Sequence, residues 1–494
     1  MLHKKKYVRI ISFGLLLVLF FMHYPFLDAD PDTQVSLHTR GAWTDEGLYT
    51  SQIRNLINHD HFDLKENSTF VRGPFLNILQ LPFFYIFGTS LQVSRLITLI
   101  LTLLVLFLYL KREKYFLFGL LLLGITFTQY HVFQFSHYGL AEIICIDFIL
   151  LSLFFMIKYY KTRENSRDPI HFMILAALFL FLSYATKIQF LYVAIILPLT
   201  VLIKTLGEII QEKKITKSQY LPFFWSLLFT FGFALLYFLA WYLPNMEFYN
   251  YIMESETSKR FPDWNALLEV IKFNYKHLLF VSGLKIQIIL FYISLIIIII
   301  WRVNRKFVKH LSIPLIFGLV WVLIELHKIP MVYLPTRYFL SLIIASGLLI
   351  AVVFAGLAHL NRYLKYITII IVLLVIAQNT ISNYEVYKRQ SWDIKYVNDY
   401  LSQYDFQEQP VIGSWASTMS WDSKAITFPV WNNYFNYKDP INTYNPRIVV
   451  SENDESESDH TYESQGIDLK TVSDSSRIFK IWRYTVIVYW MKEK

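Results

Sequence analysis

Long runs of apolar residues, separated by short polar breaks, occupy the first 380 positions of the chain. A helix needs about 20 such residues to cross the apolar core of a bilayer. The first run, Ile10–Leu27, follows a basic N-terminus and shows no convincing cleavage pattern, so we expect an uncleaved first helix. Further spans are expected near 91–110, 115–134, 140–157, 170–190, 190–206, 220–243, 285–301, 311–328, 337–357 and 365–380. The pattern therefore predicts about eleven membrane helices.

The polar breaks between these runs alternate in charge. Lysines and arginines gather in every second break, namely 111–114, 158–167, 213–217, 302–309 and 362–365. The positive-inside rule places these breaks in the cytoplasm, together with the N-terminus. The loops near 28–73, 131–140, 244–284 and 329–337 would then face the exoplasm, and Lys187 would lie at a tight exoplasmic turn.

Two stretches do not fit the pattern of full spans. Phe75–Phe87 is short, is expected to be broken by Pro82 and closed by Gly88, and suits a re-entrant or interfacial segment. Residues 381–494 contain an amphipathic stretch, Asp393–Tyr404, and short strand-like runs at 410–416, 425–431, 447–450 and 478–490. An odd number of spans leaves this tail outside. We expect two domains, a membrane domain at 1–380 and a small exoplasmic α/β domain at 381–494.

Composition supports the class of an α-helical polytopic membrane protein. The 494 residues are 55% hydrophobic and 18% aromatic, and the mean hydropathy of +0.39 is far above that of soluble proteins. The net charge of +9 does not indicate nucleic-acid binding, because the basic residues lie in separate clusters between spans. A single cysteine, Cys145, leaves no disulfide within the chain.

The loop after the first span contains two adjacent acids, Asp45 and Glu46. In Thr44–Ile57, Thr44 would be the N-cap and both acids would fall in the first turn, where the helix dipole favours carboxylates. An apolar stripe follows, which predicts a helix lying along the membrane surface. Two interpretations stay open from these residues: the acids belong to an active site, or they only begin a helix.

Other chemistry-bearing motifs are missing from the sequence. There is no nucleotide-binding glycine loop, no HExxH and no pair of cysteines, and the histidines are isolated. No cofactor or metal ligand is assigned, and a divalent cation is left open.

Three stretches resemble the GT-C membrane glycosyltransferases, nearest to the protein O-mannosyltransferases and the lipid A aminoarabinose transferases. They are the Asp45-Glu46 pair with its helix, the segment Arg72–Leu96 (RGPFLNILQLPFFYIFGTSLQVSRL), and the Thr-Lys turn in Ser183–Phe190. Gly73 and Ile188 depart from the family pattern, where proline and glycine are common. The resemblance covers residues 1–380, and the tail matches in placement alone.

The resemblance implies transfer of a sugar from a polyprenyl phosphate to an exoplasmic hydroxyl or amine of a glycolipid, polysaccharide or protein, with inversion. It implies Asp45 as the base and Glu46 as an orienting acid. Arg72 would clamp the phosphate, with Lys187 and Arg337 as further candidates, because guanidinium groups match phosphate oxygens. Glu142 resembles a second family acid, with a helix-start acid as the alternative.

The resemblance also implies a bacterial cytoplasmic membrane and contacts with membrane lipids. A lipid-linked sugar flippase or a polysaccharide ligase is the competing class. A flippase needs a polar path across the bilayer centre, whereas the ionisable residues here gather at the exoplasmic helix ends.

Overall fold

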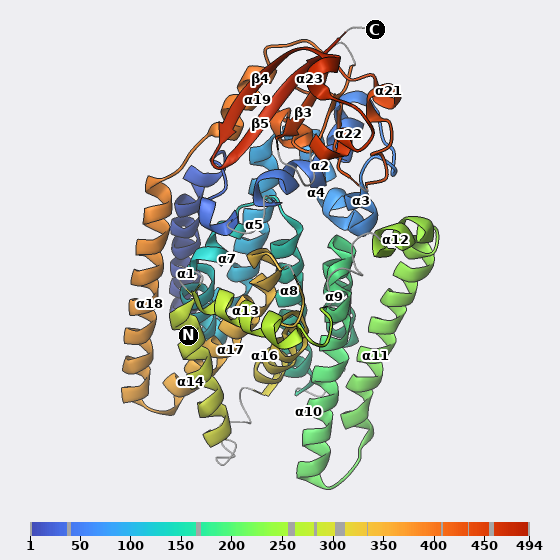
Figure 1. Cartoon of the computed structure of the whole chain (residues 1–494). Helices are drawn as coiled ribbons and strands as arrows, with labels where there is room; N and C mark the ends of the chain where they lie inside the picture. Colours follow the sequence, from blue (N-terminus) through green and yellow to red (C-terminus); the bar gives the residue numbers. More distant parts are fainter. Residues whose placement is uncertain are drawn as a thin grey trace.

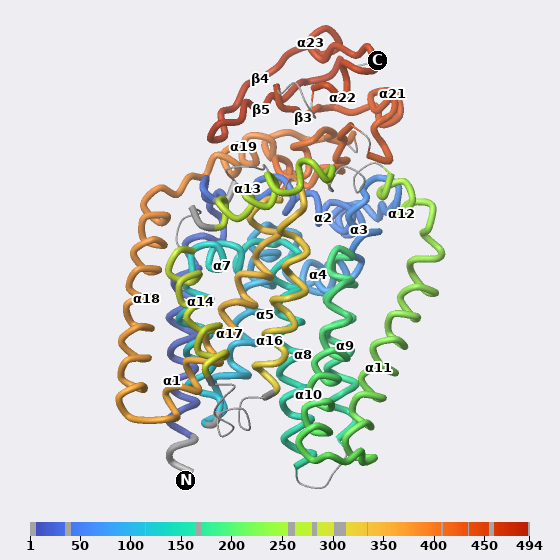
Figure 2. The backbone as a smooth tube through the Cα atoms, turned by 60° about the horizontal axis from the view of Figure 1, so that its bottom comes forward, coloured from blue at the N-terminus to red at the C-terminus, as the bar shows by residue number. Residues whose placement is uncertain are grey.

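A bundle of apolar helices carries a small mixed domain on one end (Figure 1). The computed structural model describes residues 2–36, 41–164, 169–254, 262–280, 284–301, 312–332, 334–406, 409–432, 434–453 and 459–492. The N-terminal end of the chain lies at the opposite end of the bundle from the C-terminal domain (Figure 2). The expected fold class, a polytopic helical membrane protein with a small C-terminal α/β domain, is confirmed.

The bundle is built from long apolar helices. They are α1 (Leu2–His23), α5 (Leu91–Leu110), α8 (Ala141–Arg163), α9 (Ile170–Thr186), α10 (Ile196–Glu212), α11 (Lys217–Tyr237), α14 (Lys285–Trp301), α16 (Ser312–Glu325), α17 (Leu340–Leu360) and α18 (Arg362–Lys388). Within the described ranges, six helical segments are long and apolar enough to cross a membrane. Four apolar helices are shorter, so the count of eleven spans stays a prediction.

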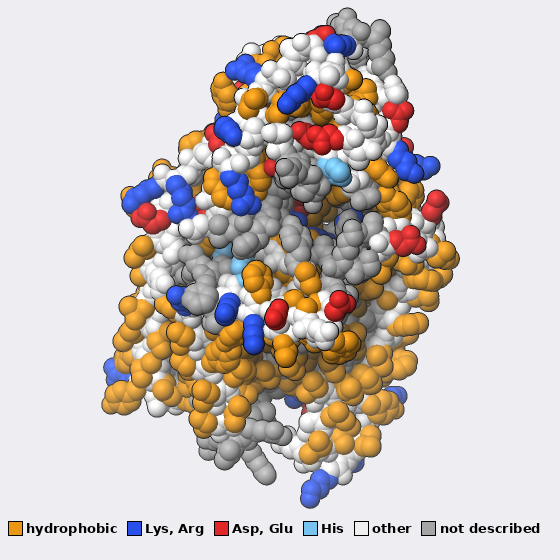
Figure 3. Space-filling view, viewed as in Figure 1, with side chains coloured by type: hydrophobic (Ala, Val, Ile, Leu, Met, Phe, Trp, Pro, Cys, Tyr) orange, Lys and Arg blue, Asp and Glu red, His pale blue; other side chains and the backbone are white. Residues whose placement is uncertain are grey.

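The surface of the bundle agrees with a membrane setting. Hydrophobic side chains cover most of the visible face of the bundle, whereas lysine, arginine and acidic side chains gather over the C-terminal domain and the adjoining end (Figure 3). Several lipid-facing side chains are strongly exposed, including Phe231 at 69% and Ile299 at 71%. Such exposure suits contact with lipid rather than water. The chain is a multi-pass membrane protein.

Two expected elements differ in the structure. The span expected at 115–134 is interrupted: α6 (Phe116–Leu122) widens into a π-helical stretch, Leu123–Phe127, and α7 (Tyr130–Phe135) follows separately. The predicted break at Pro82 is wrong, because α4 (Pro74–Phe87) is continuous through this proline and ends at Gly88. Pro82 lies inside this helix and removes one backbone hydrogen bond, and the helix continues past it.

Four further helices lie at the end of the bundle next to the C-terminal domain (Figure 2). They are α2 (Gly41–His59), α3 (Ser68–Arg72), α12 (Met246–Ile252) and α13 (Leu267–Phe280). The expected N-cap at Thr44 is wrong, since α2 already includes Gly41 and places both acids about one turn inside the helix. Almost every residue of α2 from Gly41 to Asn55 is buried, so this helix is enclosed by protein rather than exposed on a membrane surface.

The C-terminal domain is built around a mixed sheet. Its strands are β1 (Val411–Ile412), β2 (Thr427–Phe428), β3 (Ile448–Glu452), β4 (Ser473–Ile481) and β5 (Tyr484–Met491), and its helices are α19 (Asp393–Leu401), α20 (Ala416–Met419), α21 (Pro440–Tyr444), α22 (Asp459–Glu463) and α23 (Leu469–Val472). The order is β2-β1-β3-β5-β4, with β1 parallel to β2 and β3, and β5 antiparallel to β3 and β4. Because α18 runs to Lys388, it crosses the boundary expected at residue 381; the two-domain division stays a prediction.

Candidate active site

Asp45 and Arg337 form a buried ion pair below the C-terminal domain. Arg337 lies in the 3₁₀ segment Thr336–Phe339, just before α17, and its Nη1 donates to Asp45 Oδ2. The other carboxylate oxygen of Asp45 accepts from the Thr44 hydroxyl at 3.3 Å. Asp45 is 9% exposed and Arg337 is 8% exposed. The guanidinium therefore fixes the orientation of this carboxylate and balances its charge in a site largely shielded from water.

A second ion pair adjoins the first. Lys187, between α9 and a 3₁₀ segment, donates from Nζ to Glu142 Oε1 at 2.7 Å and to the Tyr49 hydroxyl at 3.1 Å. Arg337 Nε lies 3.6 Å from the same oxygen of Glu142. Glu142 thus contacts both cations, Lys187 and Arg337. The Lys187 ammonium group has three N–H donors, and Glu142 and Tyr49 use two of them, which leaves one for another acceptor.

Tyr49 connects the acid-bearing helix to this lysine. It lies four residues after Asp45, so the two side chains share one face of α2. Burial raises the pKa of the Tyr49 hydroxyl, against the opposing effect of the Lys187 charge. The hydroxyl therefore stays protonated at neutral pH and can donate a hydrogen bond to a bound anion.

A cavity opens beside these pairs. The side chains that matter for its chemistry are those of Tyr49, Arg72, Asn77, Lys187, Gln189 and Tyr338. Arg72 ends α3, and Lys187 lies on the facing wall after α9. Two cations from segments more than 100 positions apart in the chain thus line one space. A guanidinium and an ammonium group that face one space suit the binding of a phosphate, because both donate hydrogen bonds to phosphate oxygens.

Gly73 makes this approach of the two walls possible. A Cβ atom at Gly73 would lie 2.0 Å from the backbone oxygen of Thr186, the residue before Lys187. Any side chain would push the segment carrying Arg72 away from the segment carrying Lys187. Glycine at this position therefore has a local packing reason.

Asp45 and Glu142 balance the charges of Arg337 and Lys187 beside the cavity, and Arg72 is a further cation in the cavity lining.

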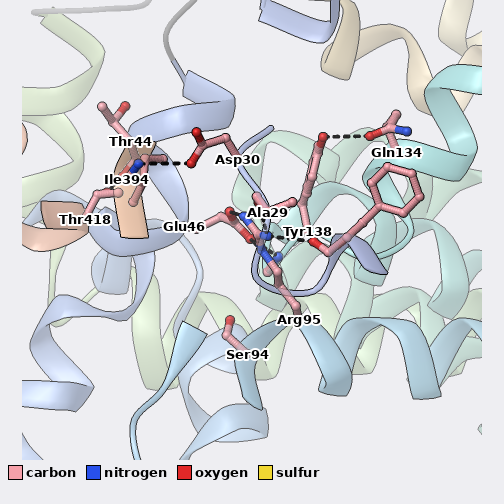
Figure 4. Close-up of polar contacts among 12 residues, drawn as sticks. Ala29, Asp30, Thr44, Glu46, Ser94, Arg95, Gln134, Tyr138, Ile394 and Thr418 are labelled. Atoms are coloured by element: carbon pink, nitrogen blue, oxygen red, sulfur yellow. Dashed lines mark hydrogen bonds and ion pairs between the residues drawn. The ribbon is translucent and has the colours of Figure 1, made fainter. Parts of the chain in front are cut away.

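Glu46 points away from this network, although it neighbours Asp45. Its carboxylate forms a two-pronged pair with Arg95 of α5, through Nε to Oε1 at 2.9 Å and Nη2 to Oε2 at 2.5 Å, and it accepts from the backbone of Gly139 at 2.6 Å (Figure 4). Arg95 Nη1 also donates to the carbonyls of Phe26 and Ala29. Adjacent helix positions differ by about 100° around the axis, which explains the two directions. Glu46 thus ties α2 to α5 and to the end of α1.

The six residues expected in the site consequently separate into two groups. Five of them, Asp45, Glu142, Lys187, Arg337 and Arg72, lie in the linked ion pairs or line the cavity. Glu46 belongs to a separate pair. The sequence predicts Tyr49 only as part of the apolar stripe in Thr44–Ile57, and it assigns no role to Arg95 or Asn77. The spacing of four between Asp45 and Tyr49 was the available signal for Tyr49.

The C-terminal domain holds the opposite face of α2. Thr418 of α20 donates to the Thr44 carbonyl at 3.0 Å, and Arg54 donates to the Ser417 carbonyl at 2.5 Å. The amide of Asn55 exchanges two hydrogen bonds of 3.0 Å with the backbone of Thr427 in β2. The domain therefore fixes the position of the helix that carries Asp45.

Gly47→Ala is expected to lower both stability and turnover by displacing α2. The added Cβ would lie 2.4 Å from Thr418 Oγ1 and 2.6 Å from the Ser417 backbone. Overpacking of this kind costs about 1–3 kcal/mol. The matched control is Gly207→Ala in α10, where nothing lies within 4 Å. Thermal unfolding and transfer rates of both variants provide the measurement; equal behaviour of the two would contradict the tight contact.

The described part of the chain contains no group of three or more histidine, cysteine, aspartate or glutamate side chains placed to hold a metal ion.

Comparisons with known proteins give matches in structure alone. No protein-family model matches the sequence, and no curated protein matches it. The crystal structure of ArnT from Cupriavidus metallidurans bound to undecaprenyl phosphate matches with a TM-score of 0.57 and 14% identity, over 97% of each chain. The apo form gives a TM-score of 0.56.

An archaeal oligosaccharyltransferase is also similar. AglB from Archaeoglobus fulgidus, in complex with an inhibitory peptide and a dolichol-phosphate, matches with a TM-score of 0.51 and 12% identity, over 89% of this chain and 69% of its own. ArnT and AglB are both GT-C transferases. The protein therefore has the GT-C fold over nearly its whole length, and the resemblance inferred from its sequence is confirmed at the level of the fold.

Proposed function

We propose that the protein is a membrane glycosyltransferase that moves a sugar from a polyprenyl-phosphate donor to an acceptor hydroxyl or amine. The observation that carries this proposal is the cavity lined by Arg72 and Lys187, directly beside the buried Asp45–Arg337 pair. The ligands of the two structural neighbours support it, since ArnT was solved with undecaprenyl phosphate and AglB with a dolichol-phosphate. The acceptor side would be the exoplasm of a bacterial cytoplasmic membrane, with the N-terminus in the cytoplasm.

Transfer requires two events that these residues suit. The acceptor oxygen or nitrogen attacks the anomeric carbon, the bond from that carbon to the phosphate oxygen breaks, and the electron pair leaves with the phosphate. Asp45 takes the proton that the acceptor loses. Arg72, Lys187 and the Tyr49 hydroxyl stabilise the charge that grows on the departing phosphate. Attack opposite to the leaving phosphate inverts the anomeric centre.

The remaining charges position these groups. Arg337 orients Asp45 by a direct hydrogen bond, and Glu142 holds Lys187 and Arg337 together. Arg337 is therefore assigned to the base rather than to the phosphate. Glu46 holds α2 in place through Arg95 and takes no part in the chemistry.

The decisive assay uses purified protein in proteoliposomes with a radiolabelled polyprenyl-phosphate sugar and a crude acceptor fraction. The proposal expects release of free polyprenyl phosphate together with a labelled acceptor. Movement of the intact donor across the membrane, without cleavage, would instead identify a flippase and overturn the proposal.

Arg72→Ala is expected to lower transfer efficiency by about ten- to a hundredfold, chiefly through weaker donor binding. A hydrogen bond to a charged group contributes about 1.5–3 kcal/mol. Arg72→Lys should keep part of the activity, because the charge survives while the two-pronged geometry is lost. The control is Lys65→Ala, an exposed residue in the preceding loop. Normal donor affinity and turnover in Arg72→Ala would remove Arg72 from the site.

A further inference from the structure

Asn77 is a buried amide that lines the proposed donor cavity, and its side-chain oxygen has no partner in the part of the chain that the structure describes. It lies on α4, is 1% exposed, and shares the cavity with Arg72 and Lys187. Its Oδ1 makes no hydrogen bond to any residue that the structure describes. The neighbouring Asn67 differs, because its amide nitrogen donates to the Leu48 carbonyl and its oxygen accepts from the backbone of Thr69.

An unpaired buried amide is costly. Leaving such a group unsatisfied costs about 1–3 kcal/mol, so each one calls for an explanation, such as a bound water or a ligand group. Since Asn77 lines the cavity, the missing partner is a group that enters this space. The amide offers both a donor and an acceptor, so it suits a ligand group with the same dual character.

The place of Asn77 on α4 separates it from the phosphate-binding end. It lies four residues beyond Gly73, which is slightly more than one helical turn, or about 6 Å, further along the wall than the backbone next to Arg72. A phosphate held by Arg72 and Lys187 has charged donors already. A hydrocarbon tail offers no hydrogen-bonding group. The sugar attached to the phosphate carries hydroxyls, which both donate and accept.

We propose that Asn77 is a specificity-determining residue, whose amide hydrogen-bonds a hydroxyl of the sugar on the lipid-phosphate donor. This inference rests on the proposed function, and it predicts that Asn77 separates sugar-bearing donors from the bare lipid phosphate. A site that pairs with a substrate hydroxyl also rejects analogues lacking it, because its own polar group is then left unpaired.

The test compares binding of two probes to the full-length protein in nanodiscs: polyprenyl phosphate, and a set of polyprenyl-phosphate hexoses that differ at single hydroxyls. Asn77→Leu should weaken binding of the preferred hexose donor by about tenfold and reduce the differences among hexoses. Its Kd for bare polyprenyl phosphate should stay within about twofold of wild type. Asn77→Asp, which keeps an acceptor of similar size but loses the amide donors, should also change the order of preference.

Gln80→Leu is the matched control. Gln80 is a second buried amide on the same helix, and its Oε1 also has no partner among the described residues, but its nitrogen donates to Ser94 at 3.0 Å and it is absent from the cavity lining. Its removal should lower the melting temperature and leave the ratio of the two affinities unchanged.

Four results would overturn the inference. Equal weakening of both probes in Asn77→Leu would assign the amide to the phosphate. Unchanged affinities for both probes would make Asn77 a packing residue. A wild-type protein that binds bare polyprenyl phosphate but no hexose donor would reject the sugar contact alone, whereas failure to bind either lipid would reject the proposed function as well.

Discussion

Asp45→Asn is expected to lower turnover by at least about 10²-fold while leaving donor affinity near that of wild type. The amide keeps the size of the side chain and an oxygen that can accept from Arg337, but it cannot take a proton. The loss should therefore appear in the chemical step. Rapid-mixing kinetics under single-turnover conditions separate this step from binding.

Asp60→Asn is the matched control for Asp45→Asn. Asp60 follows α2, is exposed, and has a φ of 53°, a backbone conformation that asparagine adopts readily. This variant should transfer sugar at the wild-type rate. Near-normal turnover in correctly inserted Asp45→Asn would overturn the assignment and transfer the role of base to Glu142.

Glu46→Gln should fail in a different way, by loss of stability rather than of chemistry. Arg95 is 1% exposed, and removing its carboxylate partner leaves a buried charge poorly compensated. Breaking a buried ion pair by removing one partner costs about 3–5 kcal/mol. We expect a lower melting temperature and lower yield in membranes, with near-normal turnover per folded molecule.

The double variant Glu46→Met with Arg95→Met provides the matched comparison. Removing both charges leaves no uncompensated ion, so the double variant should lose less stability than the sum of the two single variants Glu46→Met and Arg95→Met. A Glu46→Gln protein with wild-type stability and greatly reduced turnover would instead place Glu46 in the reaction.

Sequence patterns predict the fold well where the signal is local. The length of the apolar runs predicts most of the helices. The short strand-like runs of the tail predict its strands, and the run 478–490 forms the hairpin of β4 and β5. The interruption between α6 and α7 was missed because a π-helical stretch leaves an apolar run unchanged.

The site was predictable only in part, because the residues that interact in it are far apart in the sequence. Asp45 and Arg337 are 292 positions apart, and Thr44 and Thr418 are 374 apart. No periodicity relates such positions. Glu46 and Asp45 look alike in the sequence, and only the location of Arg95 on α5 separates a structural acid from the proposed base. The burial of α2 likewise depends on the C-terminal domain above it.

The most direct test of the proposed donor site is a cryo-EM structure of the protein in nanodiscs with polyprenyl phosphate. The phosphate is predicted in the cavity between Arg72 and Lys187, with its oxygens about 2.7–3.2 Å from their nitrogens and within reach of the Tyr49 hydroxyl. A phosphate bound elsewhere, with this cavity free of lipid at saturating ligand, would contradict the assignment of the cavity as the donor site.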